Sequence, residues 1–516
     1  MRPRALVVPM LAAAMALVSP VSAADAASHS ATVKVTVIGR SGKSLTSTVD
    51  LVNVTTGKRY TVTAGKSKRV PNGTYVIGSY IAETGKLTLA ARTIVVDRST
   101  SLTFDARTGK RITASVDQAH ARLTRVAADL RVHTSVGDVP LAEADTEVSG
   151  HPTVYAIPAS GGRARLSLAM TLTDATVSPS PYRFDLARTT KGIPTSLNVT
   201  AKKADLARVD LDLHTPDPDL KRRVDLAPNP TDGAFAMEFG GGFGDAPGLL
   251  APQHLSSYRS PQVNWRTTYT AAGHGRGAQV FEIAPASADL TQPVYRAGHT
   301  YAETWGSGAW GPSAPSLQFA TMDGKLGALA FWPLCAPEAG GVHPDNCVSD
   351  DDSSFRLFRG PTQLAEGAEF EAAIPATPDW YDLQLDGTRP TGATTSTAYS
   401  ARWHVLAGGS IDRTTLEQGL ITLAAAGLNG HNAAGRSSTT RITMSVTGFD
   451  STTSTDLAYS TDGTTWNSLA MTKSGGSWVA DVPNPAGAGG VSLRANAAAA
   501  SGSTVSETIS NAYAID

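Results

Sequence analysis

The sequence predicts an all-β protein built from several β-sandwich domains in tandem, of immunoglobulin-like and prealbumin-like type. Polar and apolar residues alternate in short segments such as residues 31–37, where Val33, Val35 and Val37 would share one face of a strand. Turn-forming residues are frequent, with 48 glycines and 30 prolines among 516 residues. No long amphipathic helical pattern interrupts these segments. Together, these observations favour stacked sheets.

Residues 1–26 have the composition of a secretory signal peptide. Arg2 and Arg4 precede an apolar run over residues 5–18, and small residues follow up to residue 23 or 26. The apolar run is about fourteen residues long, short of the roughly twenty that a helix needs to cross a bilayer. We therefore expect a secreted, extracellular protein without a membrane span.

Residues 27–110 form the first predicted domain, a small β-sandwich. Thr56-Gly57 and Pro71-Asn72-Gly73 have the composition of tight turns between alternating segments. Short strands at this spacing are typical of sandwich folds. The predicted strands cover residues 31–37, 49–54, 59–63, 75–82, 87–96 and 101–105.

Residues 111–392 form a longer β-rich region, too large for one immunoglobulin-like unit. We predict one large sandwich or two fused ones, with the strand order left open. Glycine, proline and small polar residues separate the predicted strands throughout. These strands cover residues 152–157, 165–173, 182–188, 208–213, 263–270, 279–283, 300–305, 327–332, 354–358 and 380–385.

Residues 393–516 form the last predicted domain, an immunoglobulin-like sandwich. Asp462-Gly463 marks a hairpin turn ahead of Trp466. The alanine-rich residues 423–428 and 495–500 have helical propensity, but flanking glycine, serine and threonine argue against helices there. The predicted strands cover residues 399–406, 440–446, 456–460, 477–480 and 491–495.

Cys335 and Cys347 are the only cysteines, and we expect them to form a disulfide because an exported chain permits one. A zinc site would need four ligands, which the short loop between them does not offer. Hard oxygen ligands for calcium occur in and beside this loop, although their spacing does not match an EF-hand and a solvated acidic loop is the simpler interpretation. The weak calcium candidates are Asp345, Asp350, Asp351 and Asp352. No other cofactor is expected.

No complete catalytic motif is present in the sequence, so no catalytic residue is assigned. Neither the Gly-x-Ser-x-Gly of hydrolase nucleophile elbows nor the His-Glu-x-x-His of zinc peptidases occurs. The 11 histidines are scattered singly. A secreted hydrolase with a non-standard site in the middle domain stays open as an alternative, with His254, His274 and Asp245 as its candidate residues.

Aromatic residues of the middle region offer a candidate ligand groove. Aromatic faces provide contact area at little cost in side-chain entropy. Alternating aromatic residues on strands also fill cores, and this alternative stays open. The groove candidates are Trp265, Tyr269, Tyr301, Trp305 and Trp310.

Residues 294–305, Val-Tyr-Arg-Ala-Gly-His-Thr-Tyr-Ala-Glu-Thr-Trp, carry a specific likeness. With the following Gly311-Pro312, they resemble the long non-catalytic C-terminal region of large secreted subtilisin-like serine peptidases of actinobacteria. Residues 102–110, 354–360 and 491–494 are similar to that region in the same order. The sequence contexts of the family's three catalytic residues have no match here. The resemblance therefore implies a peptidase-associated chain without the peptidase domain.

Residues 27–110 also resemble the carboxypeptidase-regulatory-like, prealbumin-like sandwich, which implies a folding or binding module without its own activity. A formal net charge of −1 with interspersed signs makes nucleic acid an unexpected partner. We expect a secreted, non-catalytic accessory protein that binds a protein, a wall polymer or polysaccharide, or a substrate surface. A passive structural or adhesive surface module is a further alternative, and the oligomeric state stays open.

Overall fold

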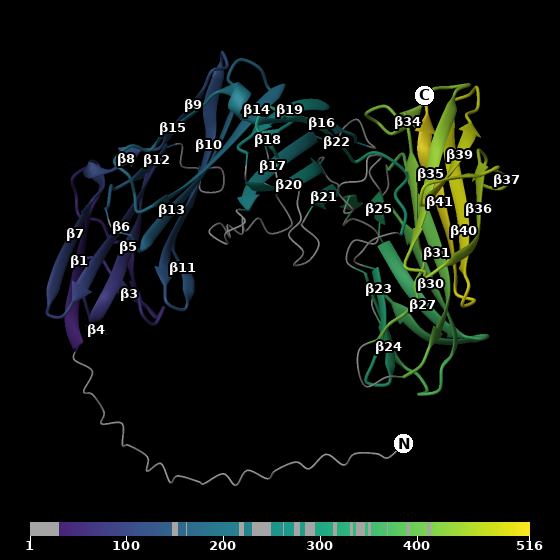
Figure 1. The fold of residues 1–516 in the computed structure, drawn as a ribbon, viewed down its shortest axis with the longest axis horizontal. Coiled ribbons are helices and arrows are strands. Elements are labelled where there is room, and N and C mark those ends of the chain that lie inside the picture. The colour runs from purple at the N-terminus through teal and green to yellow at the C-terminus, as the bar shows by residue number, and fades with distance from the viewer. Residues whose placement is uncertain are drawn as a thin grey trace, which may run out of the picture.

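The computed structural model consists of strands and two single-turn 3₁₀ helices, Ala106–Thr108 and Lys203–Asp205, in the part of the chain that it describes (Figure 1). The strands form several separate sheets. The predicted all-β class with several sandwiches is therefore confirmed. The structure describes residues 30–146, 153–160, 162–215, 221–229, 249–261, 263–272, 279–283, 295–312, 317–330, 334–336, 346–348, 352–368, 370–389, 393–409 and 414–516.

The first unit packs a three-stranded sheet, β4-β1-β7, against a six-stranded sheet, β3-β2-β5-β6-β12-β8. The alternation of Val33, Val35 and Val37 predicts one buried face, and these side chains are at most 1% exposed in the core between the two sheets. The strands are β1 (Ser30–Ile38), β2 (Thr48–Asn53), β3 (Arg59–Thr63), β4 (Ser67–Pro71), β5 (Gly73–Glu83), β6 (Lys86–Val96), β7 (Thr100–Asp105), β8 (Lys110–Arg111) and β12 (Thr153–Ala156).

The six-stranded sheet is covered on its second face as well. Val52, Val76 and Leu87 point into another core, which this sheet shares with the seven-stranded sheet of the middle region. Both faces of β5 and β6 are therefore apolar over most of their length. Strand β12 pairs in parallel with β6, so this sheet continues past residue 110, where the sequence predicted a domain boundary.

The middle region is organised by a seven-stranded sheet with the order β11-β10-β13-β14-β19-β16-β22. A four-stranded sheet, β18-β17-β20-β21, and a two-stranded sheet, β15-β9, complete it. The strands are β9 (Thr113–Val116), β10 (Ala121–Thr134), β11 (Gly137–Asp145), β13 (Ala164–Asp174), β14 (Tyr182–Lys191), β15 (Asn198–Ala201), β16 (Ala207–Leu213), β17 (Lys221–Asn229), β18 (Leu249–Leu250), β19 (His254–Arg259), β20 (Asn264–Ala272), β21 (Gln279–Ile283) and β22 (Thr300–Trp305).

The C-terminal unit is built on a nine-stranded sheet along the path β28-β27-β30-β31-β41-β40-β36-β37, with β34 also paired to β41. It shares a core with the four-stranded sheet β33-β35-β39-β38. Two smaller sheets, β29-β24-β23-β32 and β25-β26, accompany them. The strands are β23 (Leu317–Met322), β24 (Lys325–Ala330), β25 (Leu334–Ala336), β26 (Asn346–Val348), β27 (Asp352–Arg359), β28 (Thr362–Gly367), β29 (Phe370–Ala373), β30 (Asp379–Thr388), β31 (Ala398–Ala407), β32 (Thr414–Thr415), β33 (Leu420–Ala425), β34 (Ala433–Ala434), β35 (Thr439–Thr447), β36 (Thr452–Ser460), β37 (Asn467–Ser468), β38 (Thr472–Ser474), β39 (Ser477–Pro483), β40 (Gly489–Ala499) and β41 (Thr504–Ile515).

The nine-stranded sheet also crosses a predicted boundary. Strands β27 and β30 precede residue 392 and pair through β31 with β41, so both sides of that position contribute to one sheet. The two alanine-rich segments lie mainly in strands β33 and β40, which confirms that they are not helical. Small alanine side chains fit here because both strands face a core.

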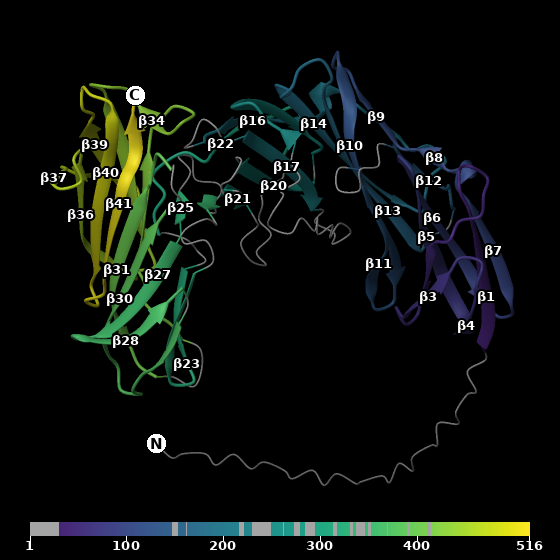
Figure 2. The same ribbon diagram turned by 180° about the vertical axis from the view of Figure 1, so that it is seen from behind.

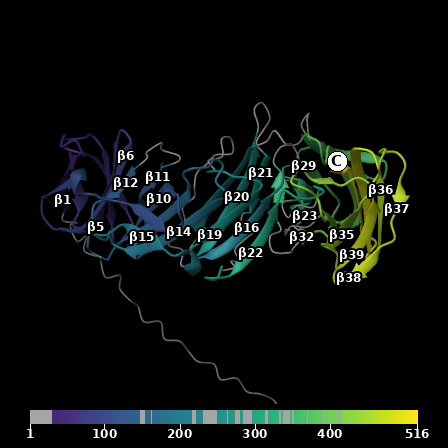
Figure 3. The same cartoon turned by 90° about the horizontal axis from the view of Figure 1, so that it is seen from above.

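The sheets follow one another along an arch. Figures 1 and 2 show the first unit at one end of the arch, the seven-stranded sheet near its middle and the C-terminal unit at its other end. Seen from above in Figure 3, the three groups lie in a row. In the part of the chain that the structure describes, no helix is both long enough and apolar enough to cross a membrane.

Candidate binding surface

The two cysteines face each other in a short sheet. Cys335 in β25 and Cys347 in β26 are directly opposite partners in antiparallel register. Opposite residues in such a pair have Cα atoms about 4.5–5.5 Å apart, which falls within the usual range for disulfides. The backbone is therefore compatible with the expected disulfide, which stays a prediction.

Three calcium candidates, Asp345, Asp350 and Asp351, lie outside the described residues. Asp352 is the first residue of β27, where the backbone alone is described. Among the residues with described side chains, no group of three or more histidine, cysteine, aspartate or glutamate residues is arranged to hold a metal ion. Calcium binding therefore also stays a prediction.

The aromatic residues considered for a groove lie mainly in the interior. Trp265, Tyr269, Trp305 and Trp310 are at most 5% exposed and belong to the hydrophobic core that runs from the middle region into the C-terminal unit. Tyr301 is partly buried and packs against the same core. The groove interpretation is therefore wrong for the four buried residues, because their rings fill a core.

The segment that carries the family resemblance has a structural explanation. Arg259 of β19 is fully buried, and its Nη1 donates to the Tyr295 hydroxyl at 2.7 Å. This hydroxyl donates to Glu303 Oε1 at 2.5 Å, and Trp305 Nε1 donates to Glu303 Oε2 at 3.3 Å. Residues 295–305 thus supply polar groups that an arginine buried in the sheet requires.

The same face of the seven-stranded sheet continues as a buried polar network. Arg183 donates to both carboxylate oxygens of Asp185 at 2.7 Å, and the two side chains are 3% and 1% exposed. The Ser257 hydroxyl donates to Asp185 at 3.3 Å and accepts from Arg259 Nε at 3.1 Å. These contacts connect β14 to β19, and their burial assigns them to the interior of the fold.

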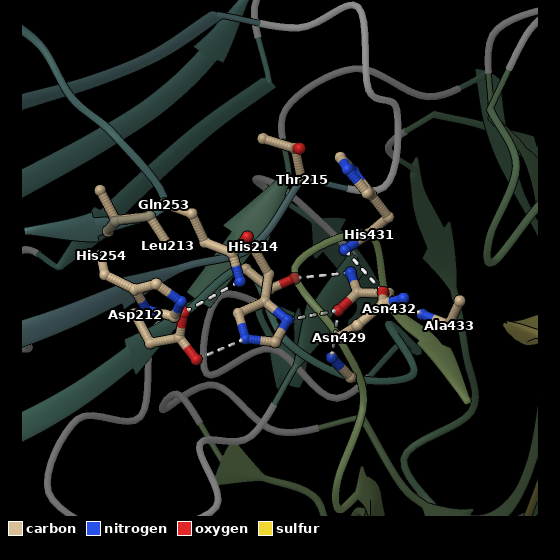
Figure 4. Close-up of polar contacts among 12 residues, drawn as sticks. Asp212, Leu213, His214, Thr215, Gln253, His254, Asn429, His431, Asn432 and Ala433 are labelled. Carbon is tan, nitrogen blue, oxygen red and sulfur yellow. Dashed lines mark hydrogen bonds and ion pairs between the residues drawn. The ribbon is translucent and has the colours of Figure 1, made fainter. Parts of the chain in front are cut away.

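The hydrolase alternative can be examined at His254, because His274 and Asp245 lie outside the described residues. His254 Nδ1 lies 3.1 Å from Asp212 Oδ1, and His214 Nε2 lies 3.1 Å from Asp212 Oδ2 (Figure 4). The other ring nitrogen of His214 faces the Asn432 side-chain oxygen at 3.2 Å. An amide oxygen thus stands where a catalytic triad has its nucleophile. Within the described residues, neither histidine bonds to a serine hydroxyl.

A different surface combines exposed polar groups with a fixed geometry. Strands β27, β30, β31 and β41 are neighbours in the nine-stranded sheet, and alternate residues of each point away from the core. Gln384, Arg402 and Ser506 lie opposite one another on successive strands, as do the members of the adjacent row. They line a shallow depression of about 350 Å³. We call this surface the polar face; it is lined by Phe358, Gly360, Asp382, Gln384, Arg402, His404, Thr504 and Ser506, with the buried Leu383 and Trp403 beneath them.

An aspartate on the polar face's margin orients two arginines. Arg402 Nη2 donates to Asp386 Oδ1 at 2.8 Å, and Arg356 Nη2 contacts the other oxygen of the same carboxylate. All three side chains remain 35–40% exposed. The carboxylate therefore holds both guanidinium groups in place and leaves them accessible to solvent.

A histidine of the polar face stacks on a tryptophan at its margin. His404 Nδ1 lies 2.7 Å from Asp382 Oδ1, and the two side chains are 40% and 47% exposed. The His404 ring stacks on Trp380 with centroids 4.6 Å apart and an interplanar angle of 4°. The result is a rigid aromatic edge beside planar hydrogen-bonding groups.

The polar face could not be predicted from the sequence, because its residues are far apart along the chain. Only the pairing of β30 with β31 and of β31 with β41 brings them together. The available signal was the alternation in residues 380–386, Trp-Tyr-Asp-Leu-Gln-Leu-Asp, which places polar residues on one side of a strand. That signal predicts an exposed face but not its neighbours across the sheet.

Comparison with known proteins does not assign the chain to a family. No family model and no curated protein matches the sequence. Alpha-2-macroglobulin from Salmonella, reacted with methylamine, aligns with 9% identity and a TM-score of 0.17, covering 91% of this chain and 37% of its own. Alpha-2-macroglobulin from Escherichia coli, activated by porcine elastase, aligns with 8% identity and a TM-score of 0.13, covering 94% of this chain and 53% of its own. The chain thus spans about half or less of these proteins, and TM-scores this low support no conclusion about fold or function.

Proposed function

We propose that this protein is a secreted, non-catalytic accessory protein that binds a polysaccharide through the polar face of its C-terminal unit. The observation that carries the proposal is the open depression of about 350 Å³, lined by charged and amide side chains on neighbouring strands. Hydrogen bonding within the sheet holds the strands in register, so these groups are positioned before any ligand arrives. The resemblance of residues 294–305 to accessory regions of secreted peptidases supports the same role.

The chemistry of the polar face favours a hydroxyl-rich ligand. Arg402 offers hydrogen-bond donors, Asp382 offers acceptors, and Gln384 offers both, which matches the paired hydroxyl groups of a sugar. The stacked rings of Trp380 and His404 add an aromatic edge against which apolar ring hydrogens can pack. Positive and negative side chains alternate, so a neutral glycan fits better than a polyanion such as nucleic acid.

Secretion is part of the proposal, with residues 1–26 as the signal peptide. In an oxidising compartment, Cys335 and Cys347 would form the disulfide that closes the loop between β25 and β26. Mass spectrometry of the secreted protein before and after reduction tests both points. Retention of residues 1–26 contradicts the proposed cleavage, and two alkylatable thiols in the unreduced protein contradict the disulfide.

Binding to insoluble polysaccharides tests the proposed function. We expect the purified protein to sediment with at least one member of a panel containing peptidoglycan, cellulose, chitin and starch. Arg402→Ala is expected to weaken this binding by about tenfold, as for loss of one charge-assisted hydrogen bond. The matched control is Arg441→Ala, which removes a surface arginine paired with Asp481 on the other sheet of this unit and should leave binding unchanged. Failure to bind any polymer, or equal losses in both variants, would refute the proposal.

A further inference from the structure

A polar joint connects the middle region to the C-terminal unit. It is formed by the end of β16, the segment after β22 and the loop between β33 and β34. The Thr215 amide donates to the Gly430 carbonyl at 2.8 Å, and the His214 amide donates to the Trp305 carbonyl at 2.7 Å. Residues distant in the sequence therefore meet at His214, which is 2% exposed.

Asn432 presents a fixed acceptor to this histidine. Its Nδ2 donates to the Gly306 carbonyl at 2.7 Å, and its Oδ1 accepts from the Gly308 amide at 3.4 Å. These two contacts determine which end of the fully buried side-chain amide carries the oxygen. The oxygen is therefore the atom that faces His214 Nδ1 at 3.2 Å.

Both ring nitrogens of His214 consequently face oxygen acceptors. Nδ1 faces Asn432 Oδ1 at 3.2 Å, and Nε2 faces Asp212 Oδ2 at 3.1 Å (Figure 4). A neutral imidazole donates from one nitrogen only, whereas an imidazolium donates from both. We propose that His214 is a proton-dependent latch, which holds the C-terminal unit against the middle region while its ring carries both protons.

Charged and hydrogen-bonding groups from neighbouring strands surround His214. The Asp212 carboxylate lies 3.1 Å from His214 Nε2 and is shared with the exposed ring of His254. Arg222 donates to the backbone carbonyl of Leu213 at 2.9 Å, and Tyr269 donates to the carbonyl of His214 at 2.8 Å. The titratable groups that face the latch are Asp212 from β16, Arg222 from β17, His254 from β19 and Tyr269 from β20.

Loss of one proton leaves two acceptors facing each other across 3.1–3.2 Å. Either Asn432 or Asp212 then faces a lone pair of His214, and the contact changes from attractive to repulsive. Histidine is the side chain that exchanges this proton between about pH 5 and 8. The joint is therefore expected to loosen as pH rises through this range.

Hydrogen exchange of the full-length mature chain tests the latch. Exchange of peptides covering residues 305–308 and 429–434 is measured between pH 5.5 and 8.5 and corrected for the intrinsic pH dependence of exchange. We expect protection to fall about tenfold over this range in the wild-type protein, as for loss of one charge-assisted hydrogen bond. His214→Gln should abolish the pH dependence, because its amide does not titrate.

Two further variants distinguish the latch from its surroundings. His254→Gln shares the Asp212 contact but does not reach Asn432, so it should retain the wild-type pH dependence. Asn432→Asp places a second carboxylate at Nδ1 and should move the loss of protection to higher pH. The proposal is overturned if protection is independent of pH in the wild type, if His254→Gln loses the pH response, or if Asn432→Asp leaves the pH profile unshifted.

Discussion

Replacing Glu507 by glutamine is expected to stabilise the C-terminal unit at alkaline pH. Glu507 lies on β41 opposite Ala401 and Ala495, and it is 3% exposed. Its carboxyl group lies against Gly311 so closely that a Cβ atom at residue 311 would overlap it. Burial raises the pKa of this carboxyl group to about 8, because the charged form is poorly solvated inside the sheet.

The direction and size of the effect follow from proton binding. In the unfolded chain Glu507 loses its proton above its usual pKa of 4.5, whereas the folded protein retains the proton up to about pH 8. The folded state therefore binds more protons in this window, and stability falls as pH rises from 4.5 to about 8. The difference between the two pKa values corresponds to about 5 kcal/mol, an upper bound for the loss.

Urea unfolding at pH 5 and pH 8.5, followed by tryptophan fluorescence, measures this loss. Glu507→Gln should match the wild type within about 1 kcal/mol at pH 5 and exceed it by several kcal/mol at pH 8.5. Glu417→Gln is the control, because a hydrogen bond from Ser501 lowers the pKa of Glu417, so its removal brings no gain at high pH. Equal stability of Glu507→Gln and wild type at pH 8.5 would refute the reasoning.

Three other substitutions examine the interior. Arg183→Ala leaves the Asp185 carboxylate, 1% exposed, without its charged partner and should cost about 3–5 kcal/mol in urea titrations; unchanged stability contradicts a buried ion pair. Gly306→Ala, at φ +71°, places a methyl group against the carbonyl of His214 and should lower the free energy of unfolding by about 1–3 kcal/mol or more. A wild-type melting temperature would contradict this packing. Trp403→Ala removes a ring that is 1% exposed and should cost about 3–5 kcal/mol; a loss below about 1 kcal/mol contradicts its place in the core.

The fold class could be predicted because period-two alternation reports directly on burial. Val33, Val35 and Val37 illustrate this, since all three share a core-facing side. Sheet membership could not be predicted in the same way. The pairing of β12 with β6 and of β31 with β41 joins segments far apart in sequence, and alternation contains no information about which strand lies alongside.

The residues of the candidate surface likewise could not be assigned from alternation alone. Aromatic residues such as Trp265 and Trp305 have a pattern that suits either a groove or a core, and only the packing distinguishes the two. The polar face could not be predicted for the complementary reason, because Asp382, His404 and Thr504 become neighbours through strand register alone. His214 carries no local sequence signal, since its partner Asn432 comes from another unit.

The position of β41 has a consequence for the order in which the chain acquires structure. This strand is the last in the sequence, yet it lies between β31 and β40 and also pairs with β34. During synthesis from the N-terminus, the earlier strands of this sheet keep open edges until residues 504–515 emerge. The first unit can fold while later residues are still being synthesised. The C-terminal unit cannot complete its sheet before its final segment is present. Fragments that stop before β41 are therefore expected to expose strand edges and to be removed by proteolysis.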